Sequence, residues 1–321
     1  MQANYKSKLV VVMHVYNEEL RIERCLHSLK IQNIDFLCVI SDNRSTDNTL
    51  SLINRESNLD SRFIVIQPEK HLSQMDHYIF ICDFVFKKIQ NSQYIMTLGA
   101  DDVLLSDNYL ASLSKWLDQN LDYQLVSPQI INCNIGTGKT SVVSPHLSSR
   151  YSFVRLLKFS TQSSSSGFIN FVNGMMRTHT YLNYSKLWAY YGDLEIAQVS
   201  QRKIKTEFAV FIDLIILAKV GNCSSVKLFK EVGNRSSNGN RKSLDIKSSE
   251  SKTLKSNSGL VANLNHQIRS MLIPYNAYLY FKNQSSAIHN IYSFVYACLS
   301  LITNLYSLIL FKLNRVLRGS T

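Results

Sequence analysis

Three short polar segments carry side chains that could bind a charged ligand, and each follows an apolar run: Tyr16-Asn17-Glu18, Asp42-Asn43 and Asp101-Asp102. Carboxylates gathered at one place repel one another unless a cation or a ligand rich in donors lies among them. A Gly-Ala step before Asp101 lets the backbone turn sharply. A hard divalent cation held by one carboxylate and a diphosphate would suit that turn. Adjacent aspartates also form ordinary turns and cap helices, so this pair alone leaves both interpretations open.

The elements that must position these residues alternate in type along the first 120 residues. Short apolar runs predict strands, and amphipathic stretches between them predict helices. The strands are expected at 9–13, 36–40, 63–66 and 94–98, and the helices at 18–30, 46–55, 75–89 and 106–117. This alternation predicts an α/β fold with a mostly parallel central sheet and helices on both faces. Because ligands bind at the carboxyl ends of such strands, the three polar segments are expected at one edge.

The rest of the chain is less regular and suggests an appendage. A mixed pattern fills 121–232, with an apolar helix expected near 208–220. Residues 234–258 are rich in Ser, Asn and Lys and predict a flexible loop or linker. We therefore expect a catalytic domain at 1–232, made of a nucleotide-binding half (1–120) and an acceptor half (121–232). A flexible loop at 233–258 and a C-terminal helical appendage at 259–321 would follow.

Three segments together resemble the family 2 glycosyltransferases in order and spacing. They are VVVMHVYNEE at 10–19, VISDNRSTDNT at 39–49 and LGADDVL at 98–104, and IERCL at 22–26 resembles the family's first helix. The resemblance extends over residues 8–120, weakens to 230 and is absent beyond. It implies a GT-A fold and inverting transfer of a sugar from a nucleotide-sugar donor, as in bacterial surface-glycan synthesis.

Carried over position by position, the resemblance assigns roles to five residues. Tyr16 would lie against the nucleotide base, near Glu18, and Asp42 would accept a hydrogen bond from the base. Asp101, the last acid of the family's Asp-x-Asp motif, would bind a divalent metal (Mn²⁺ or Mg²⁺), and Asp102 beside it would belong to the same metal site. Uridine is the commonest base in the family, so the resemblance implies a UDP-sugar donor.

The sequence departs from the family pattern at three positions. His14 stands where the family usually has proline, and Arg44 where it usually has glycine. Gly99 replaces the first acid of Asp-x-Asp, so one ribose or metal contact of the family is missing.

An inverting transfer needs a base that removes the proton of the acceptor hydroxyl, and a carboxylate is the usual choice. In the family it opens an apolar helix late in the domain, and residues 212–221 resemble that helix. Asp213 is therefore the predicted base, with Glu207 and Asp193 in reserve. The alternative is a buried aspartate that caps or pairs within its helix.

Composition limits the setting of the protein. The net charge of +12 implies an anionic partner: nucleic acid, a membrane surface or a nucleotide diphosphate. The six cysteines form no CxxC pair and predict buried free thiols in a reducing compartment. The only apolar run near the N-terminus, 9–13, is too short for a secretory signal, so a cytoplasmic location is expected.

The C-terminal region suggests contact with a membrane. Residues 291–311 carry no charge, and Lys312, Arg315 and Arg318 follow directly. This predicts a membrane-associated helix at the inner face of the cell membrane, with a lipid-linked or polysaccharide acceptor. The alternative is a helix that packs on the catalytic domain.

Other readings of the motifs are weaker. Gly-Thr-Gly-Lys-Thr at 136–140 is not a phosphate loop, because Cys133 occupies the place of the first glycine and no helix follows. A nucleic-acid binder would need interleaved aromatic and basic residues, which are missing. A membrane-associated nucleotide-sugar-binding protein without turnover remains the alternative to the enzyme.

Overall fold

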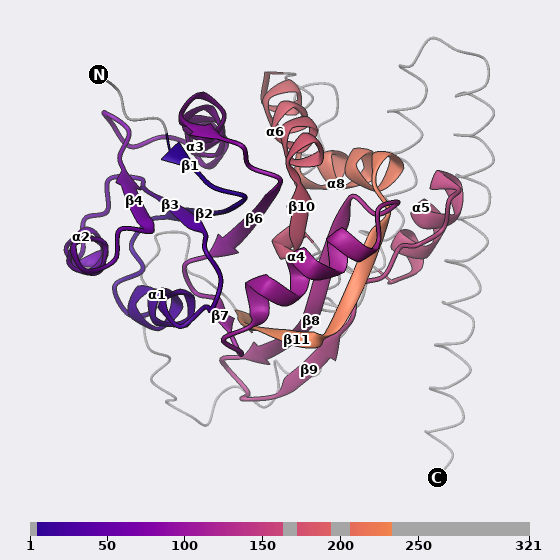
Figure 1. Ribbon diagram of the computed structural model, residues 1–321, viewed down its shortest axis with the longest axis horizontal. Helices are drawn as coiled ribbons and strands as arrows, with labels where there is room; N and C mark the ends of the chain where they lie inside the picture. Colours follow the sequence, from indigo (N-terminus) through magenta and orange to yellow (C-terminus); the bar gives the residue numbers. More distant parts are fainter. Residues whose placement is uncertain (1–4, 163–171, 194–205, 233–321) are drawn as a thin grey trace, which may run out of the picture. The chain divides into compact units, whose positions relative to one another are not determined.

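The computed structural model describes residues 5–162, 172–193 and 206–232 of the chain. They form two compact units, one with 5–148, 172–193 and 218–232, the other with 149–162 and 206–217. Figure 1 labels their helices and strands. Within these ranges no helix is both long and apolar enough to cross a bilayer. The predicted loop at 233–258 and the predicted helical appendage, with its stretch at 291–311, lie outside the described residues.

The first unit alternates strands and helices as the sequence predicts. Its elements are β1 (Tyr5–Lys6), β2 (Leu9–Val15), α1 (Ile22–Lys30), β3 (Leu37–Asp42), α2 (Thr49–Leu59), β4 (Phe63–Ile66), α3 (Gln74–Lys88), β5 (Ile89–Gln90), β6 (Tyr94–Gly99), β7 (Val103–Leu104), α4 (Tyr109–Gln119), β8 (Leu125–Asn134), β9 (Thr140–Val143), β10 (Met175–Arg177), α6 (Thr178–Asp193) and β11 (Val220–Val232). All four predicted strands and all four predicted helices of the N-terminal half are confirmed, with ends that differ by a few residues.

The central sheet has the order β4-β3-β2-β6-β10-β8-β11-β7, and β9 pairs with β8. The first four strands are parallel to one another. Next, β10 is antiparallel to both β6 and β8, while β11 is parallel to β8 and antiparallel to β7. The predicted α/β class is therefore confirmed, with a parallel first half and a mixed second half.

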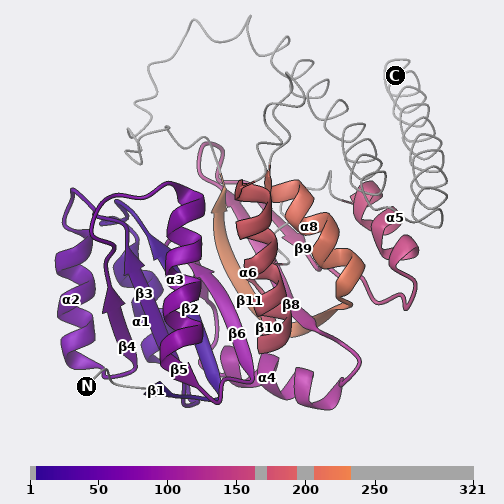
Figure 2. The ribbon, with the colours of Figure 1, turned by 90° about the horizontal axis from the view of Figure 1, so that it is seen from above.

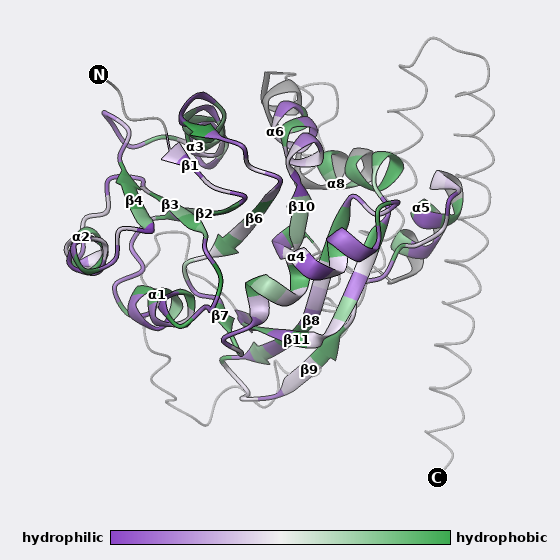
Figure 3. Cartoon of the chain, in the orientation of Figure 1, coloured by the Kyte–Doolittle hydropathy of each residue, from purple (hydrophilic) through white to green (hydrophobic). Residues whose placement is uncertain are grey.

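Strand β2 lies at the centre of the parallel half and is buried on both faces. Leu9, Val11 and Met13 belong to one continuous core with the apolar residues of α1 and α4. On the opposite face, Figures 1 and 2 show α3 and α6, which pack together through tyrosines (Tyr78 and Tyr184 ring centroids 5.7 Å apart). Burial on both faces explains why the strand is a continuous apolar run rather than an alternating one (Figure 3).

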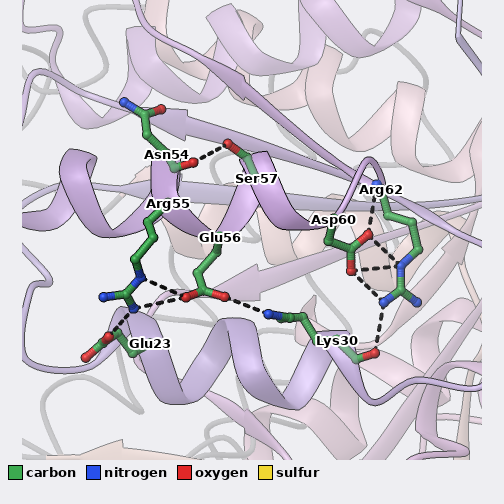
Figure 4. A network of polar contacts seen from close by, with 8 residues as sticks. All are labelled: Glu23, Lys30, Asn54, Arg55, Glu56, Ser57, Asp60 and Arg62. Atoms are coloured by element: carbon green, nitrogen blue, oxygen red, sulfur yellow. Dashed lines mark hydrogen bonds and ion pairs between the residues drawn. The ribbon is translucent and has the colours of Figure 1, made fainter.

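A network of ion pairs fixes α2 and the start of β4 against α1 (Figure 4). Lys30 of α1 binds the carboxylate of Glu56 in α2 at 2.8 Å, and Arg55 binds the same carboxylate at 2.9 Å. Arg62 pairs with Asp60 at 2.7 Å and donates to the carbonyl oxygen of Lys30 at 2.8 Å. Such partly exposed pairs contribute little stability, so their effect is to orient the helices.

The second unit contains α5 (Ser152–Gln162) and α8 (Thr206–Leu217). Arg155 is buried and donates to the carbonyl oxygens of Ile215 (2.7 Å) and Ile216 (2.5 Å). These carbonyls belong to the last turn of α8, where a helix supplies no partner of its own for its carbonyl oxygens. The helix ends at Leu217 rather than near 220, as the sequence suggests, because Val220 begins β11.

Gly221, at the start of β11, tests how closely the strand packs on α4. A Cβ atom at this position would lie 1.9 Å from the ring of Trp116, a partly buried side chain that packs against the core. Gly221→Ala is expected to lower the free energy of unfolding by about 1–3 kcal/mol in urea titrations. Gly136→Ala is the control, because its Cβ would meet nothing closer than 3.5 Å. Equal stability of the two variants would contradict the packing described.

Candidate functional site

The strand register brings the three polar segments to one edge of the sheet. Val15 of β2 is paired with Asp42 of β3, and His14 of β2 is paired with Gly99 of β6. The residues that follow β2, β3 and β6 therefore leave the sheet at its carboxyl edge, side by side, with the β2 segment in the middle. This is the arrangement that the sequence predicts.

The segments after β2 and β3 are joined by hydrogen bonds that use both backbone and side chains. The amide of Asn17 donates to Ser45 Oγ (3.0 Å), and the amide of Thr46 donates to Asn17 Oδ1 (2.8 Å). The amide of Glu18 donates to Thr49 Oγ1 (2.8 Å) in the first turn of α2. The backbone of one segment is thus held by the side chains of the other, so the two form one rigid rim.

Asp42 is fully buried beneath this rim. Its Oδ2 accepts hydrogen bonds from the amide of Ser45 (3.1 Å) and from Gln67 Nε2 (2.7 Å). Its Oδ1 is also buried, and no donor reaches it in the described part of the chain. A buried acceptor without a donor costs free energy, which a ligand N–H would recover. Asp42 is therefore oriented by its neighbours through one oxygen, while the other has no donor among the described residues.

The segment after β4 is tied to the end of β3. Arg44 donates to the carbonyl oxygens of Pro68 (2.7 Å) and Glu69 (2.9 Å). Asn43 exchanges two hydrogen bonds with the backbone of Leu72, each 2.9 Å long. Residues 67–72 thus border the edge of the sheet next to the rim, and we call this segment the third wall. The sequence did not predict its position. The only sequence signal was Pro68, which stops the strand before it.

Tyr16 lies against this third wall. Its ring centroid is 4.6 Å from that of His71, and 37% of the residue is exposed. His71 Nδ1 lies 2.9 Å from the carbonyl oxygen of Asn43, which fixes the imidazole. An exposed ring supported from behind offers a flat apolar face to a base. His71 was not among the predicted site residues.

Two of the departures from the family pattern have a local explanation. Arg44 has a φ of 60°, a left-handed conformation that glycine adopts most easily, and its two hydrogen bonds to the third wall hold it there. His14 stacks on Tyr78 of α3, with ring centroids 4.9 Å apart and an interplanar angle of 11°. Burial lowers the pKa of His14 to about 3, so its imidazole is neutral at pH 7 and serves as an aromatic filler.

The third departure, Gly99, is explained by the acidic turn that follows it. Asp101 and Asp102 are buried, and both carboxylates fold back over Gly99. A Cβ on residue 99 would lie 2.8 Å from Asp102 Oδ2 and 2.9 Å from Asp101 Oδ1. An acid at this position would therefore collide with the two that are present.

Asp102 is held by three neighbours. Lys230 Nζ lies 2.7 Å from its Oδ1, and Asn173 Nδ2 donates to its Oδ2 at 2.9 Å. The amide of Gly99 also donates to Oδ2, at 3.2 Å. Burial raises the pKa of the Asp102 carboxyl group, and the adjacent Lys230 acts in the opposite direction. Asn173 and Lys230 lie outside the segments with sequence signals and were not predicted.

A metal at this edge would depend on the ligand for much of its coordination. Among the residues that the structure describes, no group of three or more His, Cys, Asp or Glu side chains could hold a metal ion. The acidic turn nevertheless offers carboxylate oxygen, the donor that Mg²⁺ prefers, and Mg²⁺ is commonly bound by one or two carboxylates together with substrate phosphates. The residues present fit a cation of that kind.

The predicted base and its two reserves are the remaining candidates for the site. Asp213 and Glu207 lie on α8 in the second unit, and Asp193 ends α6. The side chains of all three lie outside the described part. Their roles stay predictions.

The described cysteines match the expected buried free thiols. Cys25, Cys38, Cys82 and Cys223 are buried and Cys133 is half-buried, and each of the five is a free thiol. Burial raises the pKa of Cys25, of Cys38 and of Cys82, which reaches about 12. Thiols of this kind are poor nucleophiles, so we assign them no chemistry. Cys298 lies outside the described residues.

Comparison with solved structures supports the fold. The structure of S. aureus TarS 1–349 in complex with UDP-GlcNAc is similar, with a TM-score of 0.53 and 12% identity, over 92% of this chain and 72% of that one.

Comparison with sequences supports a family. Abequosyltransferase RfbV of Salmonella typhimurium (strain LT2) is 29% identical over 136 residues, which are 41% of this chain. The match spans only 38% of the length of that relative. The model of the family "Glycosyl transferase family 2" matches residues 10–180, more than half of the 321 residues. This match includes β2, β3, β6 and the polar segments at their ends, and on this ground the chain belongs to glycosyl transferase family 2.

Proposed function

We propose that the protein transfers a sugar, with inversion, from a UDP-sugar to a lipid-linked or polysaccharide acceptor in surface-glycan synthesis. One observation carries the proposal: Asp42, whose buried Oδ1 has no donor among the described residues, and the acidic turn at Asp101 lie at the ends of β3 and β6, the two strands that flank β2. A hydrogen-bond acceptor suits the N–H of a base, and an acidic turn suits a cation on a diphosphate. A nucleoside diphosphate contains both groups.

The base would be bound by the rim and the third wall. Tyr16 would stack on it, supported by His71, and Asp42 Oδ1 would accept its N–H. Glu18 would act less directly, because its carboxylate pairs with Arg21 at 3.2 Å while its amide joins the rim to Thr49. We therefore assign Glu18 to holding the shape of the nucleotide site.

The diphosphate would lie near the acidic turn, with a divalent cation held by Asp101 and adjacent to Asp102. When bound, Mn²⁺ or Mg²⁺ would neutralise the charge that develops on the leaving diphosphate. The turn itself keeps water away from part of this region, since Asp101 is only 4% exposed. Charges interact more strongly where water is excluded.

The acceptor hydroxyl would lose its proton to Asp213 as its oxygen attacks the anomeric carbon. Attack from the side opposite to the diphosphate inverts the configuration at that carbon. The alternative is a nucleotide-sugar-binding protein without turnover, which Gly99 favours because the turn has one acid fewer than the family motif. Hydrolysis or transfer of a donor separates the two.

The setting follows from the relatives and from the C-terminal sequence. The names of the relatives include an abequosyltransferase and a structure with UDP-GlcNAc, which supports a donor activated by a nucleotide. We propose a cytoplasmic enzyme at the inner face of the membrane, reached through 291–311 and the basic residues after it.

A panel of UDP-, GDP- and CDP-sugars with Mn²⁺ or Mg²⁺ tests the function, scored by release of nucleoside diphosphate. Wild type is expected to use one base preferentially and to lose activity with EDTA. Asp101→Asn should lower kcat/KM by about 100-fold or more, because the cation is worth several kcal/mol in the transition state. Release that is equal in wild type and Asp101→Asn would rule out this role.

Asp42→Asn tests the base contact by calorimetry with UDP. Replacing the carboxylate weakens a charge-assisted hydrogen bond, so the Kd for UDP should rise about tenfold. Asp60→Asn is the matched control, because Asp60 precedes β4 and therefore lies at the opposite end of the strands. An unchanged Kd in Asp42→Asn would show that the base lies elsewhere.

Asp213→Asn tests the proposed base. Transfer should fall by about 100–10,000-fold, whereas the Kd for UDP-sugar should stay within about twofold of wild type. Glu207→Gln and Asp193→Asn, measured beside it, identify the base if Asp213 is dispensable.

A further inference from the structure

Lys230, near the end of β11, places its charged ammonium group beside Asp102 of the acidic turn. Lys230 Nζ lies 2.7 Å from Asp102 Oδ1 and 2.9 Å from Asp102 Oδ2, so it bridges both oxygens of a fully buried carboxylate. Asn173 and the amide of Gly99 complete the shell around Oδ2. This carboxylate already has the contacts that a metal ion would otherwise supply.

Lys230 is held in place by its neighbour in sequence. Glu231 binds Arg21 Nε at 3.1 Å and Arg24 Nη1 at 2.8 Å, which fastens the end of β11 to α1. Arg24 Nη2 also donates to the carbonyl oxygen of Asp101 at 3.3 Å. Two consecutive residues of β11 therefore reach both aspartates, one directly and one through Arg24.

The charges at the turn explain what this arrangement achieves. Both carboxylates lie within 3 Å of the position that a Cβ of residue 99 would take, so they would repel each other strongly in a buried place. We propose that Lys230 is a fixed counter-ion and positioning residue for Asp102, so that Asp102 is not a ligand of the cation. The cation then binds together with the donor diphosphate rather than before it. This inference rests on the proposed function, and it revises the prediction that both aspartates serve the metal.

Removing the counter-ion should change the response to metal before any chemistry occurs. In Lys230→Met a buried carboxylate loses its partner, and Mn²⁺ becomes the obvious replacement. The variant should therefore unfold at a Tm roughly 10 °C lower than wild type without metal, and Mn²⁺ alone should recover part of that loss. Wild type should gain no stability from Mn²⁺ alone.

Thermal unfolding of the full-length protein, with and without Mn²⁺, provides the first test. Lys230→Arg should keep most of the stability, and Asp102→Asn alone should lose it, because a buried lysine is left unpaired. The double variant Lys230→Met/Asp102→Asn should unfold closer to wild type than either single variant. Lys219→Met is the control: Lys219 binds Asp122 at 2.6 Å just before β11, but the aspartate is exposed. Additive losses in the double variant would overturn the pairing.

The second test measures Mn²⁺ binding by electron paramagnetic resonance, with and without UDP. Lys230→Met should bind Mn²⁺ without UDP about tenfold more tightly than wild type. The double variant should bind Mn²⁺ in the presence of UDP as wild type does, because Asp102 supplies no metal ligand in wild type. Loss of Mn²⁺ from the double variant would show that Asp102 is a ligand and overturn the proposal, as would equal Mn²⁺ affinity of wild type and Lys230→Met without UDP.

If wild type binds no UDP at all, the proposed function fails. The coupling of Lys230 to Asp102 is then judged by thermal unfolding alone.

Discussion

Negative charge gathered at one edge of a sheet is the constraint on which this structure depends. Parallel strands β2, β3 and β6 release their following segments at the same edge, and two of these segments contain buried aspartates. Each buried carboxylate needs donors or a cation. Asp42 obtains two donors for one of its oxygens, and Asp102 obtains a lysine, an amide side chain and a backbone amide. The hydrogen bonds and the ion pair that these two aspartates accept also hold the loops around them in place. The shape of this edge therefore depends on how the two carboxylates are paired.

Much of the first half of the fold could be predicted from the sequence, because buried parallel strands are continuous apolar runs. The run at 9–13 and the helix at 18–30 left little choice of structure, and the observed β2 and α1 agree with them. Beyond residue 120 the prediction was weaker. There, β8 and β11 are long, carry exposed polar residues and pair with partners remote in sequence, as Val220 does with Leu125. No local pattern encodes such pairing.

Site residues could be predicted where a polar side chain comes directly after an apolar run that forms a strand. They could not be predicted where a residue from a remote segment reaches the site through tertiary packing. Tyr16, Asp42 and Asp101 were found because they end apolar runs. Lys230 and Asn173 reach the acidic turn from segments more than 70 residues away in sequence, where nothing marks them. No sequence pattern marks His71 or Gln67 either, because their positions depend on how Asn43 and Arg44 fix the segment after β4. The departures at Gly99 and Arg44 become intelligible only with the backbone and the carboxylates in view.

The short strand β10 has a consequence for biosynthesis. It pairs on one side with β6 through Met175, Met176 and Arg177, and on the other with β8 through Met175 and Met176. As the chain leaves the ribosome, β2, β3, β4 and β6 can assemble well before residue 175 is made. Until then β6 presents an open edge with unpaired backbone groups, a surface on which other chains can add strands. Nascent chains that stop before β10 should therefore be prone to aggregation, and three residues close that edge when synthesis continues.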